Sequence, residues 1–119
     1  FRQEPKVMGT DWLQSKAHPG WLPAGPWLVP GWDVPDPAAL RLWLRLNGQV
    51  MQDGCAADML FAVAEQIAYL SRHVPLMPGD LVCTGSPAGF GSHHRRFLQP
   101  GDVLEAGVTG LGAQRVACI

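Results

Sequence analysis

Apolar and polar residues alternate strictly between positions 40 and 46. The even positions are Leu40, Leu42, Leu44 and Leu46, and the odd positions are Arg41, Trp43 and Arg45. A period of two places the leucines on one face of a half-buried β-strand. Asn47-Gly48 follows, and both residue types tolerate the positive φ angles of a type I′ turn. Residues 40–52 therefore predict a β-hairpin, which ends where Asp53-Gly54 breaks the pattern.

The apolar period changes to that of a helix after the hairpin. The apolar stripe consists of Leu60, Val63, Ala64, Ile67, Leu70 and Val74. The polar residues Glu65, Gln66 and Arg72 lie off this stripe, as in an amphipathic helix. We expect one helix from about residue 60 to residue 73, and Pro75 ends it.

A Pro-Gly-Asp triplet occurs twice, at residues 78–80 and 100–102, and an apolar run follows each copy. Proline presets φ at the second position of a turn, and glycine takes the positive φ at the third. Each triplet therefore predicts a turn that starts a strand, at residues 81–82 and from residue 103. We expect Asp80 and Asp102 to accept hydrogen bonds from the backbone of their own turns.

Residues 1–36 contain frequent prolines and no clear periodicity. Proline fixes φ and lacks an N–H donor, so this stretch is neither a long helix nor a central strand. The tryptophans within it are Trp12, Trp21, Trp27 and Trp32. Because an indole has a large apolar area to bury, we expect an irregular segment packed over the core, with a short strand near residues 27–29. The whole pattern predicts a mixed, mainly β fold with one helix.

Composition narrows the possible functions. The 119 residues suit one domain, and 9 Lys plus Arg nearly balance 10 Asp plus Glu, for a net charge of −1. This balance offers no basic surface for nucleic acid, and no window reaches the roughly 18 apolar residues of a membrane span. Three widely spaced cysteines favour neither a disulfide framework nor a structural zinc site, and they suit a cytoplasmic protein. The chain begins at Phe1 rather than at a methionine, as if cut from a longer protein.

Two features are candidates for binding chemistry. The glycine-rich stretch 84–91 follows an apolar run, and such loops often bring backbone N–H groups close to an anion. It has neither the ending of a P-loop nor the spacing of a nucleophile elbow. It is either a substrate-facing loop that presents the hydroxyls of Thr84 and Ser86, or a plain turn. Lys16 lies among aromatic residues, where it either binds a carboxylate or is a solvated surface lysine.

The other titratable residues show no catalytic pattern. Residues 93–96, His-His-Arg-Arg, form a basic run. Adjacent residues on a strand point to opposite faces, so the two histidines would not readily chelate one metal, and we expect a solvated loop. No set of His, Cys, Asp and Glu residues in the sequence has the spacing of metal ligands.

Nine short motifs follow one another along almost the whole chain. They are residues 11–16 (Asp-Trp-Leu-Gln-Ser-Lys), 23–27 (Pro-Ala-Gly-Pro-Trp), 34–37 (Val-Pro-Asp-Pro), 46–48 (Leu-Asn-Gly) with Gln52, 58–61 (Asp-Met-Leu-Phe), 78–80, 84–89 (Thr-Gly-Ser-Pro-Ala-Gly), 100–102 and 110–112 (Gly-Leu-Gly). Their order resembles the C-terminal part of the fumarylacetoacetate hydrolase family. The resemblance implies a β-roll fold, usually dimeric, and hydrolytic C–C cleavage of acylpyruvates or other 2-oxo acids, with decarboxylases and isomerases as relatives. It also implies a divalent cation, commonly Mg²⁺, that holds the 2-oxo acid.

The resemblance assigns roles to a few positions. Lys16 matches the family's active-site lysine, which lies near the metal and the substrate oxygens. Ser86 matches the threonine of the family's Gly-Thr-Pro signature, whose hydroxyl contacts the substrate carboxylate. Thr84 and Gly85, beside it in the same loop, are further candidates for substrate binding.

The start of the chain carries the remaining assignments. Gln3, or its neighbour Arg2, matches a substrate-contacting glutamine of the family. The family's metal carboxylates, a Glu-x-Glu pair and an aspartate of an Asn-Asp segment, precede the region matched by Phe1. The resemblance therefore assigns no metal ligand to residues 1–119.

We expect residues 1–119 to be the C-terminal portion of the catalytic domain of such an enzyme, a cytoplasmic homodimer that acts on a small 2-oxo acid. The alternative is a non-catalytic β-roll that serves as a binding or dimerisation module, with Trp43 of the hairpin as a contact residue. A Glu-x-Glu and Asn-Asp segment encoded upstream would favour the enzyme. We expect the 119-residue chain alone to bind Mg²⁺ weakly and to turn over no substrate.

Overall fold

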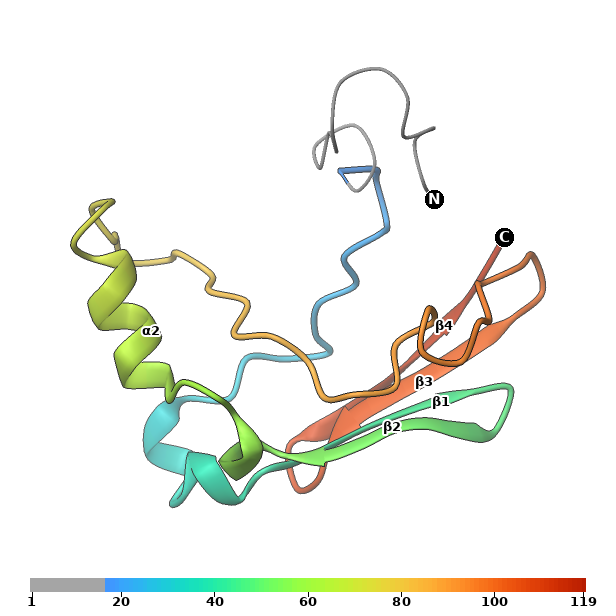
Figure 1. The fold of residues 1–119 in the computed structure, drawn as a ribbon, viewed down its shortest axis with the longest axis horizontal. Coiled ribbons are helices and arrows are strands. Elements are labelled where there is room, and N and C mark those ends of the chain that lie inside the picture. Colours follow the sequence, from blue (N-terminus) through green and yellow to red (C-terminus); the bar gives the residue numbers. More distant parts are fainter. Residues whose placement is uncertain (1–16) are drawn as a thin grey trace.

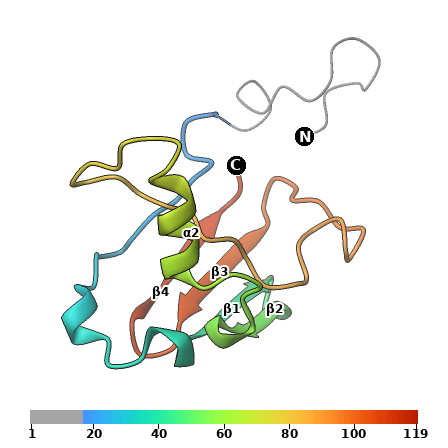
Figure 2. The same ribbon diagram turned by 60° about the vertical axis from the view of Figure 1, so that its left-hand side comes forward.

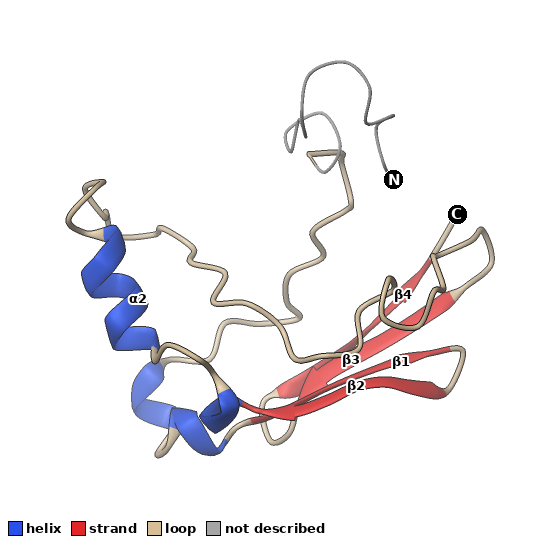
Figure 3. Cartoon of the chain, viewed as in Figure 1, coloured by secondary structure: helices blue, strands red, loops and turns tan. Residues whose placement is uncertain are grey.

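The computed structural model describes residues 17–119 (Figure 1). Four strands form one antiparallel sheet in the order β2-β1-β3-β4. The strands are β1 (Arg41–Leu46), β2 (Gln49–Cys55), β3 (Val103–Val108) and β4 (Gly112–Ala117). The helices of the described residues are α2 (Val63–Leu70) and the short 3-10 helices η1 (Gly31–Asp33), η2 (Pro37–Ala39) and η3 (Ala56–Asp58). For the described residues, the prediction of a mainly β fold with one α-helix is confirmed. Figure 3 shows the sheet in red and the helices, short 3-10 helices included, in blue.

The predicted hairpin is present as β1 and β2. Asn47 and Gly48 form its turn with φ angles of 51° and 83°, as a type I′ turn requires. The prediction that Asp53-Gly54 ends the hairpin is wrong, because β2 continues to Cys55. Asp53 is held in the strand by Arg41 of β1, whose Nε and Nη2 lie 2.7 and 2.8 Å from its two carboxylate oxygens.

Strand β3 joins the hairpin to the end of the chain. It pairs with β1 so that Leu46 lies opposite Leu104 and Leu42 lies opposite Val108. Leu46 is 7% exposed and forms the buried apolar core of the described residues. The sheet face that carries Leu42, Leu44 and Leu46, which we call the leucine face, is therefore the one that other segments cover.

The two Pro-Gly-Asp turns contain the same aspartate hydrogen bond, but only the second is followed by a strand. Asp80 accepts a hydrogen bond from the N–H of Met77 at 2.8 Å, and Asp102 accepts one from Gln99 at 2.8 Å, as predicted. The second turn starts β3, whereas residues 81–82 belong to no strand. Strand β3 has β1 and β4 as neighbours, while residues 75–90 run from α2 back to the sheet without a pairing strand (Figures 1 and 2).

Helix α2 is shorter than the predicted 60–73. It begins at Val63 because the Glu65 carboxylate accepts a hydrogen bond from the N–H of Ala62 at 2.8 Å, which caps the helix there. Residues 71–73 form turns rather than a further helical turn. Figure 1 shows α2 to one side of the sheet, and its Val63 and Ile67 are 47% and 36% exposed. Within residues 17–119 no helix has the length and apolar character that crossing a bilayer takes.

The expected burial of the tryptophans is wrong for those that the structure describes. Trp21, Trp27 and Trp32 are 46%, 64% and 86% exposed, and Trp12 lies outside the described residues. Residues 27–29 also form no strand. The described sheet has no second layer stacked on it that would enclose these side chains, although Trp27 does dock on the sheet, as described below.

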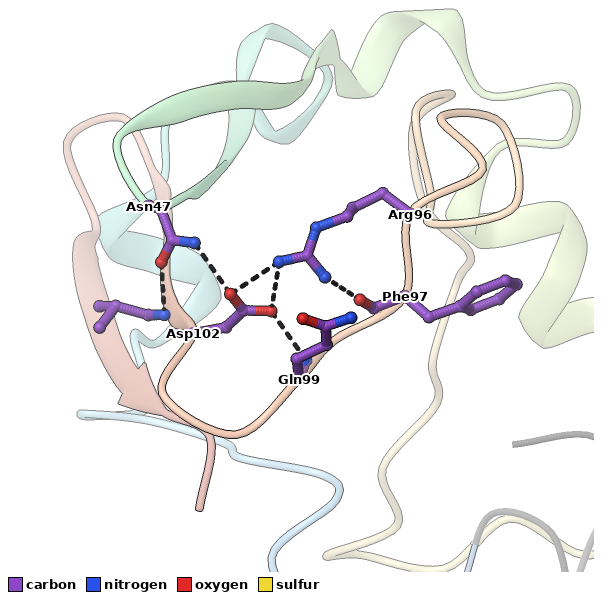
Figure 4. Close-up of polar contacts among 6 residues, drawn as sticks. Asn47, Arg96, Phe97, Gln99 and Asp102 are labelled. Atoms are coloured by element: carbon purple, nitrogen blue, oxygen red, sulfur yellow. Dashed lines mark hydrogen bonds and ion pairs between the residues drawn. The ribbon is translucent and has the colours of Figure 1, made fainter.

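A buried carboxylate ties the first hairpin to the start of β3 (Figure 4). Asp102 is 6% exposed and accepts hydrogen bonds from Asn47 Nδ2 at 2.9 Å and from Arg96 Nη2 at 2.7 Å. Asn47 Oδ1 in turn accepts from the N–H of Val103 at 2.8 Å. Arg96 thus departs from the solvated loop predicted for the basic run, whereas His93, His94 and Arg95 are exposed as expected.

This cluster makes stability depend on pH. The hydrogen bonds from Asn47 and from the N–H of Gln99, together with the Arg96 guanidinium, hold the pKa of the Asp102 carboxyl below its usual value. In the unfolded chain that carboxyl protonates with a pKa of about 3.9. The stabilisation from ionised Asp102 is therefore present above that pH and is lost as the pH falls through the lower pKa of the folded state.

We expect Asp102→Asn to lower the urea midpoint of the full-length protein at pH 7, because a neutral amide cannot pair with the Arg96 guanidinium. The matched control is Asp80→Asn, in the equivalent but exposed turn, which should lower it less. Repeating both titrations below about pH 4 should narrow the gap between wild type and Asp102→Asn. Equal midpoints for the two variants at pH 7 would contradict a stabilising role for the cluster.

Candidate functional site

A cavity of about 460 Å³ opens on the leucine face, within the size range of small-molecule sites. The floor of the cavity is formed by Leu42, Leu44, Ala106 and Val108 of the two central strands. Residues 25–29 form one wall, and residues 85–87 of the predicted glycine-rich loop form the other. Two segments far apart in the sequence therefore meet over one sheet face.

The first wall is fixed to the turn between β3 and β4 and to β4. The indole Nε1–H of Trp27 donates a hydrogen bond to the carbonyl of Leu111 at 2.6 Å, across 84 positions of sequence. The side-chain amide of Gln114 donates to the carbonyl of Gly25. The indole also rests on Gly112, where a Cβ atom would lie 2.7 Å from Cζ2 of Trp27. Glycine at position 112 therefore leaves the space that the indole occupies.

The second wall is fixed to β2 in the same manner. Gln52 donates a side-chain hydrogen bond to the carbonyl of Pro87 at 2.5 Å. Pro87 rests on Gly54, where a Cβ atom would lie 2.8 Å from Cβ of Pro87. Farther along the loop, Gly89 is buried against the carbonyl of Met51. These contacts hold residues 87–89 against the strand.

Both walls rest on two rows of residues, each of which runs across all four strands on the leucine face. The first row is Gln52, Leu44, Ala106 and Gln114, and the second is Gly54, Leu42, Val108 and Gly112. Each outer strand thus contributes a glutamine that binds a wall carbonyl and a glycine on which the wall rests. The two central strands contribute the apolar floor between them.

A β-bulge places the β2 residue of both rows. The register of the hairpin shifts between Leu44 and Arg45, so Leu44 lies opposite Gln52 rather than Met51. A bulge commonly redirects a side chain next to a functional site. Here it brings Gln52 and Gly54 to the leucine face and sends Asp53 to the other face.

The opposite face, which we call the charged face, carries the alternating polar residues of the hairpin. The hydrogen bond from Arg41 lowers the pKa of the Asp53 carboxyl. Trp43, the contact residue of the non-catalytic alternative, is half-buried, and the guanidinium carbon of Arg45 lies 5.2 Å from the centre of its ring. Arg45 therefore already engages one side of this indole.

The structure brings together only part of the predicted site. Gly85 and Ser86 line the cavity, and both are exposed. Thr84 is not among the lining residues, and its carbonyl accepts a hydrogen bond from Gln66 of α2 at 3.4 Å. Lys16 and Gln3 lie outside the described residues.

Sequence reasoning missed the groups that hold the walls: Gln52, Gln114 and the docked Trp27. The alternation gave no signal for Gln52, because only the register shift in the hairpin brings that residue to the leucine face. Among residues 17–119, no three His, Cys, Asp or Glu side chains come together as a metal site.

Comparison with known sequences identifies relatives of the chain. The family model described as "Fumarylacetoacetate (FAA) hydrolase C-terminal" matches residues 1–118. Over 117 residues the chain is 43% identical to 2,4-didehydro-3-deoxy-L-rhamnonate hydrolase of Sphingomonas sp. (strain SKA58). The matched stretch covers 96% of this chain and 41% of the relative. The chain thus spans about two fifths of the length of the curated relatives that it matches.

Solved structures agree with this assignment. The 5-carboxymethyl-2-hydroxymuconate delta-isomerase from Mycobacterium smegmatis matches with a TM-score of 0.79 at 29% identity, over 92% of this chain and 40% of that one. The maleylpyruvate hydrolase from Sphingobium sp. SYK-6, in complex with manganese(II) and pyruvate, matches with a TM-score of 0.73 at 29% identity, over 80% and 34% of the two chains. The named relatives are hydrolases and isomerases.

We expect Gly54→Ala to move the second wall, because the new methyl group would overlap Pro87. Overpacking of this kind costs on the order of 1–3 kcal/mol of unfolding free energy. Urea denaturation and the amide NMR shifts of residues 85–87 measure the two effects. Gly31→Ala is the matched control, since a Cβ atom there meets nothing within 4 Å. Unchanged shifts in Gly54→Ala would contradict the seating of the loop on β2.

Proposed function

The chain belongs to the fumarylacetoacetate hydrolase family, and from this premise we propose that it forms the substrate-carboxylate side of an enzyme that cleaves a C–C bond of an acylpyruvate or a related 2-oxo acid. The observation that carries the proposal is the place of Gly85 and Ser86 on the wall of a cavity of about 460 Å³. This volume suits a small organic acid.

Ser86 is the proposed carboxylate-binding residue. A hydroxyl donates a strong hydrogen bond to an ionised carboxylate, and backbone N–H groups of a glycine-containing loop can add to it. The loop is fastened by Gln52 and Gly54, so the carboxylate would meet a positioned group rather than a mobile one. For Thr84 we propose a role only at the edge of this site, because it does not line the cavity.

The proposed reaction adds water across a C–C bond. The oxygen of water adds to the acyl carbon, and the bond from that carbon to the methylene of the pyruvyl part breaks. The electron pair of that bond leaves as the enolate of pyruvate, which then takes up a proton. The ammonium of Lys16 is proposed to stabilise the negative charge that develops on the enolate oxygen, and Gln3 is proposed to contact the substrate.

A divalent cation, Mg²⁺ or another, belongs to the proposal and would supply Lewis-acid chemistry when bound. The maleylpyruvate hydrolase relative holds manganese(II) together with pyruvate. We propose that carboxylates outside residues 17–119 hold this cation, since no three His, Cys, Asp or Glu side chains come together within them. A cytoplasmic homodimer that acts on a small molecule, not on nucleic acid or membrane, completes the proposal.

The full-length protein should release pyruvate from acetylpyruvate, maleylpyruvate or fumarylpyruvate, measured by coupling to lactate dehydrogenase and NADH oxidation. We expect chelation with EDTA to abolish release and Mg²⁺ or Mn²⁺ to restore it, since the proposed cation is needed. A protein that neither releases pyruvate from any of the three nor binds pyruvate in calorimetry with the cation present would contradict the proposed function.

Removing the Ser86 hydroxyl should weaken substrate binding. A hydrogen bond to a charged group contributes about 1.5–3 kcal/mol, so Ser86→Ala should raise KM by roughly 10- to 100-fold. Ser86→Thr keeps the hydroxyl and should stay within a few-fold of wild type. Ser92→Ala, at an exposed position directly after this loop, is the matched control. Similar KM values for Ser86→Ala and Ser92→Ala would remove Ser86 from the site.

A further inference from the structure

Trp27 combines exposure with fixed placement. Trp27 is 64% exposed. Its indole N–H nevertheless donates a hydrogen bond to the Leu111 carbonyl, and its ring rests on Gly112. Trp32, only five positions on, is 86% exposed and does not line the cavity. An aromatic ring held in place while its surface remains open to a cavity is already arranged for a ligand, because little freedom is left to lose on binding.

The indole lies across the floor from the proposed carboxylate site. Trp27 is docked on β4 and the turn before it, whereas residues 85–87 are docked on β2. These are the outer strands of the sheet, with β1 and β3 between them. Three strand spacings amount to about 14 Å between the outer backbones, and both walls occupy part of that width. A short 2-oxo acid bound at Ser86 would therefore extend its acyl group toward Trp27.

The chemistry of the cavity selects the acyl group. Its floor is apolar, and the side-chain amides of Gln52 and Gln114 each donate one hydrogen bond to a wall carbonyl. Among the described residues that line it, none carries a charge. Within residues 17–119, a second carboxylate at the far end would therefore meet no cationic side chain and would lose hydration against the apolar floor.

We infer that Trp27 is a specificity-determining residue whose indole receives an uncharged apolar or conjugated acyl group. This inference rests on the proposed function and names the substrate class of the same site. A flat conjugated group packs against an indole face, and an aromatic contact of this kind discriminates by about tenfold beyond simple burial.

The test compares kcat/KM of the full-length protein for benzoylpyruvate, acetylpyruvate and fumarylpyruvate. We expect wild type to prefer benzoylpyruvate over both. Trp27→Ala should reduce the preference for benzoylpyruvate over acetylpyruvate by about tenfold and should change kcat/KM for acetylpyruvate by less than threefold. Trp27→Phe should restore part of the preference. Trp32→Ala, the matched control, should behave as wild type.

A second pair of variants tests the inference without Trp27→Ala, in case that variant does not fold. Gly112→Ala keeps the indole but displaces it from its seat, so the same preference should fall. Gly79→Ala also places a side chain at positive φ, but in open space and in a turn that does not line the cavity, and it should leave the preference intact. Thermal unfolding of each variant identifies any loss of fold.

The outcomes separate the inference from the proposed function. Hydrolysis with an unchanged preference in both Trp27→Ala and Gly112→Ala overturns the inference and leaves the function standing. A wild-type preference for fumarylpyruvate overturns it as well. Absence of both hydrolysis and pyruvate binding in wild type overturns the proposed function, and the inference falls with it.

Discussion

The pairing of β1 with β3 is the constraint on which the rest of the described structure depends. It joins the first hairpin to a strand near the end of the chain, and it places β2 and β4 on the two outer edges. Directly after β1, the Asn47 side chain accepts a hydrogen bond from the N–H of Val103. It also donates one to the Asp102 carboxylate, which in turn pairs with Arg96. A buried, fully bonded carboxylate is stable only while all its partners are present, which makes this junction specific as well as stable.

The cavity follows from that strand order. Two walls that are far apart in the sequence, residues 25–29 and 85–87, are each carried by an outer strand, and the central strands set the width between them. Each outer strand holds its wall with the same two residue types. A glutamine donates a hydrogen bond to a carbonyl of the wall, and a glycine leaves space for the wall residue that packs on it. The cavity is therefore a property of the whole sheet rather than of either loop.

Local features of this fold were predictable and long-range ones were not. The alternation of leucines and the Asn47-Gly48 turn specify the hairpin, because both act between neighbours. Continued beyond the turn, the same alternation places Asp53 on the leucine face, whereas the bulge places Gln52 and Gly54 there, since one extra residue shifts every later side chain to the other face. The docking of Trp27 on Gly112 and of Arg96 on Asp102 depends on tertiary contacts that no periodicity encodes.

The turn of the first hairpin has a chemical consequence of its own. In an asparagine followed by glycine, the next backbone nitrogen readily attacks the side-chain amide, because glycine has no Cβ to obstruct it. Both polar atoms of the Asn47 side chain are engaged, with Asp102 and with Val103, which restrains its rotation toward Gly48. Loss of ammonia there would leave a second carboxylate facing Asp102. The same carboxamide that joins two strands therefore also sets how slowly this protein deamidates as it ages.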